Sequence, residues 1–157
     1  MDKIRADDGD PETWDVHHWQ DVNPVHTEAL LQLTCGGPQI VYHGGLLHVR
    51  VRYYDALARR PGLPEDVAAL VSALDADSTT VELVNASPLH TREVILQAGA
   101  FGEHRFTTVT VTQDDAPQTA TVAAGHVKVT LPPGRSTVLH LGTDRYVNTP
   151  SYRQPTF

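Results

Sequence analysis

The sequence predicts a mainly β protein: an antiparallel β-sandwich of about seven to eight strands with Greek-key connections, an N-terminal arm and two short helices. The first observation is a change of hydrophobic rhythm, because apolar and polar residues alternate with a period of two from Ser78 through to Leu141. The second is the spacing of turns, since Gly, Pro and Asp clusters interrupt this stretch every ~8 to 14 residues. The third is that the strand–helix–strand alternation of a parallel sheet does not occur.

The first element after the arm is a helix predicted over residues 24–34. Asn23 is a suitable N-cap, and Pro24 falls at the first helical position. The Gly-Gly pair that begins at Gly36 would end the helix. Residues 46–54 then alternate between two faces, which predicts a strand with one buried and one solvated side.

A second helix is predicted over residues 64–74. Pro64 would open it, and acidic residues follow in its first turn. An apolar stripe at helical spacing supports this interpretation and consists of Val67, Leu70, Val71 and Leu74.

The sandwich strands are predicted over residues 78–142. One strand in this region has apolar residues on both faces, with Val94 and Leu96 on one side and Ile95 on the other. Such a strand is expected to be central and covered on both sides. Residues 143–157 are predicted to be an aromatic and Pro-containing tail that packs with its rings.

Three segments of the second half resemble a known module: "VELVNAS", "REVILQAG" and "VTLPPGRSTVLHL". Their order is similar to that in the C-terminal β-sandwich module of many glycoside hydrolases and related carbohydrate-active enzymes. The resemblance spans residues 78–142. It implies a sandwich fold and a non-catalytic role, with a catalytic domain on another chain or on a removed part of this one.

Size and charge limit the possible classes of function. The 157 residues suit one domain over residues 23–157, preceded by a polar arm over residues 1–22. A formal net charge of −7 is unfavourable for binding nucleic acid or anionic membranes. No signal peptide or transmembrane segment is recognised, which leads us to expect a cytoplasmic location. The single cysteine, Cys35, excludes an internal disulfide.

The loop "GAFGEHRF" is the first candidate site. Glu103, His104 and Arg105 together have the groups for acid–base work or for holding a carboxylate. In a regular strand Glu103 and Arg105 would share one face and His104 the other, so an ordinary bulged strand start with exposed charges is the alternative interpretation.

The segment "YHGGLLH" is the second candidate site. Tyr42 and His43 could stack on a sugar or line a partner groove, and His48 follows two glycines that let a backbone approach a ligand closely. A simple turn before a strand is the alternative interpretation. Neither segment predicts a catalytic residue, a metal site or a cofactor.

The arm is expected to anchor to a protein surface through Trp14 and Trp19. His17 and His18 with their flanking carboxylates offer metal-ligand chemistry, but neighbouring side chains point apart in an extended chain, which favours a polar arm. Cys35 is not expected to be a nucleophile, because a helix C-terminus does not lower a thiol pKa.

Two functions follow from these observations. The first is a non-catalytic accessory or interaction module associated with a carbohydrate-active enzyme domain or subunit, with a protein partner or self-association. The second is a small sugar-binding or His/Glu-dependent enzyme domain, in which Glu103, His104 and Arg105 would converge with His43 and His48.

Overall fold

The computed structural model describes residues 2–15, 17–18, 27–37, 45–114 and 116–157. Its N-terminal part contains a single helical turn, α1 (Asp2–Arg5), and a 3₁₀ turn, η1 (Pro11–Thr13). The side chain of Asp10 caps η1 by accepting a hydrogen bond from the backbone N–H of Glu12 at 3.0 Å.

Helix α3 (Thr27–Cys35) confirms the helix expected before the Gly-Gly pair. Gly36 ends it in the left-handed conformation, with φ of +66°, as predicted from the glycine pair. The Cys35 carbonyl then accepts a hydrogen bond from the backbone N–H of Arg50 at 2.9 Å, so the helix end is tied to the start of the sandwich. The predicted cap and first turn, residues 23–26, lie outside the described residues.

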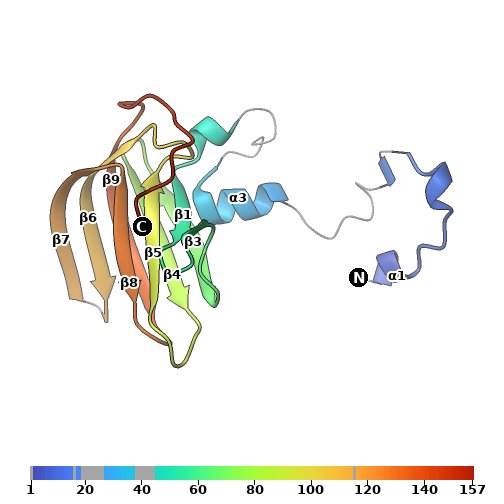
Figure 1. Cartoon of the computed structure of the whole chain (residues 1–157), viewed down its shortest axis with the longest axis horizontal. Coiled ribbons are helices and arrows are strands. Elements are labelled where there is room, and N and C mark those ends of the chain that lie inside the picture. The colour runs from blue at the N-terminus through green and yellow to red at the C-terminus, as the bar shows by residue number, and fades with distance from the viewer. Residues whose placement is uncertain (1, 16, 19–26, 38–44, 115) are drawn as a thin grey trace.

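Within the described residues, nine strands form two antiparallel sheets, which face each other as two layers in Figure 1. One sheet has the order β2-β1-β5-β8 and the other the order β3-β4-β9-β6-β7. The strands are β1 (Val51–Asp55), β2 (Arg60–Pro61), β3 (Val67–Leu74), β4 (Ser78–Asn85), β5 (Arg92–Ala98), β6 (Arg105–Gln113), β7 (Ala116–Ala124), β8 (His126–Leu131) and β9 (Ser136–Asp144). The two-layer β architecture is therefore confirmed, and the Greek-key connection stays a prediction.

The core lies between the two sheets and is built by alternate residues of the strands. Both layers contribute to one continuous cluster of buried side chains, as the period of two predicts. Its members are Val51, Tyr53, Val81, Leu83, Val94, Leu96, Ala98, Phe106, Val109, Val129, Leu131, Leu139 and Leu141.

Strand β5 is buried on both faces, which confirms the prediction of a covered central strand. It pairs with β1 on one side and β8 on the other. On its outer face Ile95 is 5% exposed and Gln97 is 1% exposed. The Gln97 Oε1 atom accepts a hydrogen bond from the hydroxyl of Tyr54 at 3.1 Å, and the ring of Phe157 packs edge-on against Tyr54. The tail thus helps to cover this outer face, as its aromatic content predicts.

The second helix predicted over residues 64–74 is wrong, because this stretch forms strand β3 at the edge of the five-stranded sheet. Val67 and Val71 are four residues apart, a spacing that satisfies a helical stripe and also places both on one face of a strand. In the structure Val67, Ala69 and Val71 pack on the core, while Leu70 is 40% exposed. Pairing with β4 over the whole strand therefore overrides the helical pattern.

The strand predicted over residues 46–54 is correct only in its second part. Its start forms a 3₁₀ turn, η3 (Gly45–His48), and β1 begins at Val51. The alternation of apolar and polar residues continues back through residues 46–48, which the structure places in the 3₁₀ turn.

Asn85 joins two of the three segments that carry the resemblance, "VELVNAS" and "VTLPPGRSTVLHL". It is fully buried, and its Nδ2 donates to the carbonyls of Leu131 and Pro132 at 3.0 and 3.1 Å. The same Nδ2 donates to the carbonyl of His90 at 2.8 Å, and the Asn85 Oδ1 accepts from the backbone N–H of Ser87 at 3.1 Å. The end of β4 and the Pro-Pro corner before β9 are therefore locked to each other.

The described part of the chain contains no helix of sufficient length and apolarity to cross a membrane.

Candidate functional site

The loop from Gly99 to His104 connects β5 to β6, and two glycines shape it. Gly99 and Gly102 adopt φ of +86° and +70°, values that residues with a Cβ rarely take. The backbone N–H of His104 donates to the carbonyl of Ala98 at 3.2 Å, and the Gln97 side chain donates to the carbonyls of Gly99 and Ala100 at 3.1 and 3.0 Å. The loop is thus tightly closed on itself.

Glu103 is the acidic member of this loop, and it is fully buried. Its Oε2 accepts a hydrogen bond from the backbone N–H of Phe101 at 2.7 Å. The carboxyl group packs directly on Gly99, where an added Cβ would lie 2.5 Å from the Glu103 carboxyl carbon. The other oxygen, Oε1, has no hydrogen-bond partner among the described residues.

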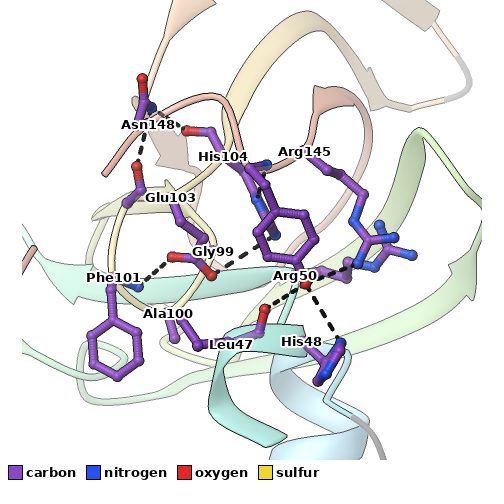
Figure 2. Close-up of polar contacts among 12 residues, drawn as sticks. Leu47, His48, Arg50, Gly99, Ala100, Phe101, Glu103, His104, Arg145 and Asn148 are labelled. Atoms are coloured by element: carbon purple, nitrogen blue, oxygen red, sulfur yellow. Dashed lines mark hydrogen bonds and ion pairs between the residues drawn. The ribbon is translucent and has the colours of Figure 1, made fainter. Parts of the chain in front are cut away.

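His104 is also fully buried and faces Glu103, with 3.8 Å between His104 Nε2 and Glu103 Oε1 (Figure 2). Its Nδ1 accepts a hydrogen bond from the backbone N–H of Tyr146 at 3.0 Å, which places the proton of the neutral ring on Nε2. Burial lowers the pKa of His104 against the opposing effect of Glu103, and Arg145 and Arg50 lower it further. The ring is therefore neutral near pH 7.

The tail holds this buried pair in place from the other side. Asn148 donates through Nδ2 to the carbonyls of Gly102 and His104 at 3.1 and 2.9 Å (Figure 2). Its backbone N–H donates to the carbonyl of Glu103 at 3.2 Å. Further along, the backbone N–H of Ser151 donates to the carbonyl of Phe101 at 2.8 Å. The pair and the tail thus form one hydrogen-bonded unit.

The structure brings together Glu103 and His104 but not Arg105. The Arg105 side chain is about half exposed and forms an ion pair with Asp144 at 2.6 Å on the surface. The alternation of a regular strand, which would place His104 on the face away from Glu103, does not apply, because the glycine-shaped loop is not a strand there. The alternative of a strand start with exposed charges does not describe Glu103 and His104, since both are buried. Strand β6 begins only at Arg105.

A cluster of cationic and hydroxyl groups lies on the surface over this buried pair, and the sequence reasoning missed most of it. Tyr146 packs edge-on against His104, with 4.7 Å between ring centroids, and donates through its hydroxyl to the carbonyl of Leu47 at 2.8 Å. The Tyr146 hydroxyl also lies 3.5 Å from His48 Nδ1. The guanidinium of Arg145 lies over the Tyr146 ring, 5.1 Å from its centroid. His48 was the predicted residue in this cluster; the tail residues carried no motif that would have indicated them.

The remaining predicted residues are placed as follows. Tyr42, His43 and Trp19 lie outside the described residues. Trp14 stacks on His18, with 3.9 Å between ring centroids. His18 Nε2 lies 2.6 Å from Asp7 Oδ2, and in the described part of the chain no group of three or more His, Cys, Asp or Glu residues is arranged to hold a metal ion.

A separate hollow of about 540 Å³ opens near the ends of β1 and β5 and is lined by charged residues. The carboxylate of Asp55 in it accepts hydrogen bonds from the backbone N–H groups of Leu57 and Ala58 at 3.1 and 2.9 Å. Arg92 in the same hollow donates to Asp66 at 3.0 Å. These charges are already engaged with neighbouring groups of the protein, so the hollow has less chemistry to offer a ligand than the surface near Tyr146.

Comparison of the chain with protein-family models, curated proteins and solved structures finds no match.

Proposed function

We propose that the protein is a non-catalytic β-sandwich accessory module that packs against a carbohydrate-active enzyme domain or subunit through helix α3. The observation that carries this proposal is the apolar outer side of α3. Leu30 and Leu33 are 55% and 53% exposed, although each could bury a substantial apolar area. Leu74 of β3, next to the helix end at Gly36, is 49% exposed.

The opposite side of α3 is attached to the sandwich. The Thr34 carbonyl accepts a hydrogen bond from the buried Tyr53 hydroxyl at 2.6 Å, and Cys35 packs against the core cluster. The exposed leucines therefore project from a firmly held helix. Burying a fully exposed leucine contributes about 1.5–3 kcal/mol, so covering each of these half-exposed side chains contributes about half of that. Adjacent exposed leucines are typical of a surface that another protein covers.

The burial of Glu103 and His104 supports a non-catalytic role for this pair. A general acid or base must lie within hydrogen-bond reach of a substrate, and both side chains are fully enclosed. Their contacts with Phe101 and Tyr146 hold the loop to the tail instead. The association with a carbohydrate-active enzyme is supported by the resemblance of residues 78–142, whose first and third segments meet at Asn85.

Site-specific photo-crosslinking tests this proposal. A benzoyl-phenylalanine replaces Leu33 in the full chain, in the cells that make it, and the matched control carries the same group at Thr119. Thr119 is exposed on β7, at the edge of the sheet opposite to β3. We expect position 33 to yield an adduct whose partner peptides come from a carbohydrate-active enzyme, and position 119 to yield none.

Three outcomes would overturn the proposal: equal adducts at both positions, an adduct between two copies of this chain, or an adduct with a protein of another class. Exchanging Leu30 and Leu33 for Asp should abolish the adduct when the crosslinker is placed at Leu74. Retention of that adduct would show that α3 is not the contact surface.

The second candidate function is a sugar-binding or His/Glu-dependent domain around Glu103 and His104. One contact favours it: Tyr146 links the buried His104 to the exposed His48. In this case His104→Ala would abolish sugar binding or turnover without lowering the melting temperature. A lowered melting temperature with unchanged sugar binding would instead indicate that His104 is structural.

A further inference from the structure

A second feature lies on the surface beside the buried pair: two arginines with a histidine and a tyrosine, which we call the cation cluster. It consists of His48, Arg50, Arg145 and Tyr146. Figure 2 shows Arg50 and Arg145 extending into the same region next to His48. Burial lowers the pKa of Arg50, and the positive charge of Arg145 lowers it further, so the two guanidinium groups repel each other across this site.

Neither guanidinium of the cation cluster has a carboxylate partner among the described residues. Other arginines of the protein do: Arg92 pairs with Asp66 and Arg105 pairs with Asp144. The carboxylate that acts on the charge of Arg50 is that of Asp75, which does not form an ion pair with it. The Asp75 carboxylate accepts a hydrogen bond from the Ser78 hydroxyl at 3.2 Å instead. In a chain of net charge −7, two half-buried arginines without such a partner are unexpected.

Hydrogen bonds to backbone carbonyls and to a tyrosine hydroxyl orient the two arginines of the cluster. Arg50 donates through Nη2 to the carbonyl of Asp75 at 2.9 Å and through Nη1 to that of Ala76 at 3.4 Å. Arg145 donates through Nη2 to the Tyr146 hydroxyl at 3.3 Å. The Arg145 Nε is buried and lacks a hydrogen-bond partner in the described part of the chain. Both guanidinium groups are thus oriented before any ligand binds, and some of their N–H donors remain without a partner in the described part of the chain.

Tyr146 adds a strained backbone to this site. Its φ of +55° lies in the left-handed region, which a residue with a large side chain rarely adopts. The bond from its N–H to His104 maintains this conformation. Such strain is found more often at ligand sites than in ordinary loops, because the surrounding structure must hold it.

We propose that the cation cluster binds a tetrahedral oxyanion, a phosphate or sulfate group. Two guanidinium groups and one imidazole match a doubly charged group better than a singly charged carboxylate. Arginine forks bind such groups with paired charge-assisted hydrogen bonds, and an anion between them would remove the repulsion between Arg50 and Arg145. The group can belong to a free inorganic ion or to an ester on a sugar. This inference does not rest on the proposed function.

Isothermal titration calorimetry on the full chain tests the inference, at constant ionic strength set with NaCl. The probes are inorganic phosphate, sulfate and glucose 6-phosphate, with acetate and glucose as controls. We expect at least one tetrahedral oxyanion to bind in a saturable way and acetate to bind more weakly. Tighter binding of glucose 6-phosphate than of inorganic phosphate would identify a sugar ester as the source, and the reverse order would identify the free ion.

Three variants assign the binding to the cluster. Arg145→Gln is expected to weaken it about tenfold, and Arg145→Lys to weaken it less, because Lys keeps the charge but loses the fork. The matched control is Arg135→Gln, which removes one charge from an arginine that pairs with Asp114 and precedes β9, whereas Arg145 follows β9. Thermal melting of each variant shows that it is folded.

Three results would overturn the inference. The first is that Arg145→Gln binds phosphate and sulfate as tightly as the unchanged protein does. The second is that no tetrahedral oxyanion binds, and the third is that acetate binds as tightly as the oxyanions do.

Discussion

The Nδ1 atom of His104 accepts a hydrogen bond from the backbone N–H of Tyr146, 3.0 Å away, and this bond joins the loop before β6 to the chain after β9. A ring nitrogen that accepts a hydrogen bond carries no proton, so the contact requires the neutral imidazole. The stability of the fold is therefore linked to the charge state of a single buried side chain.

Acidification is expected to weaken the fold through His104. Because burial lowers its pKa, the unfolded chain takes up a proton at a higher pH than the folded chain. The stabilisation is fully present above the unfolded His pKa of about 6.5, and it is lost as the pH falls from there toward the folded pKa. Burial also lowers the pKa of His126, so this residue contributes to the pH dependence in the same direction.

Urea unfolding between about pH 8 and about pH 5 measures this dependence. The unfolding free energy of the unchanged protein should fall over this range, and that of His104→Gln should fall less steeply. His126→Gln measures the separate contribution of the other histidine with a lowered pKa and leaves the bond to Tyr146 intact. An identical pH slope in His104→Gln and the unchanged protein would exclude the linkage.

Gly99→Ala is expected to be strongly destabilising for two separate reasons. The residue has φ of +86°, and its new Cβ would meet the Glu103 carboxyl group. Gly134→Ala is the matched control, since Gly134 has φ of +64° but nothing within 4 Å of an added Cβ. We expect about 1–2 kcal/mol of strain in both variants and about 1–3 kcal/mol more in Gly99→Ala. Equal unfolding free energies would mean that the Glu103 carboxyl group yields without cost.

Asn148→Ala should release the tail from the loop. It removes two side-chain hydrogen bonds to carbonyls, each contributing about 1 kcal/mol. Hydrogen exchange at the Ser151 amide, which donates to Phe101, is expected to accelerate, while amides of β5 keep their protection. Val147→Ala changes an exposed neighbour and serves as the control. Unchanged exchange at Ser151 would show that the tail is held without Asn148.

Asn85→Asp is expected to be at least as destabilising near pH 7 as Asn85→Ala, which should cost about 2–4 kcal/mol. The amide donates to three carbonyls, and a carboxylate at the same place would repel all three. Protonation restores one donor, so the stability of Asn85→Asp, relative to that of Asn85→Ala, should recover on acidification. A constant difference between the two variants from about pH 7 to about pH 4, measured by urea unfolding, would contradict this account.

Much of the sandwich could be predicted from local pattern because buried strands alternate strictly. Leu139 and Leu141 lie in the core as their period of two requires, and the Gly36 stop of α3 follows from glycine's access to the left-handed region. The same reasoning failed for β3. Val67 and Val71 fit both periods, and only pairing with β4 decides between them.

The site was predicted less well because its contacts join distant parts of the chain. Glu103 and His104 were identified from their chemistry, but their complete burial depends on a tail more than forty residues later, as the 42-residue separation of His104 and Tyr146 illustrates. Arg50 and Arg145 carry no motif and are far apart in sequence. Only the folded topology places them together.

The only cysteine of the chain has a practical consequence. Burial raises the pKa of the Cys35 thiol, so its reactive thiolate is scarce while α3 stays packed on the sandwich. Movement of the helix away from the core would restore an ordinary thiol. The rate of alkylation at Cys35 therefore reports how often α3 separates from the sandwich, and no introduced label is needed to measure it.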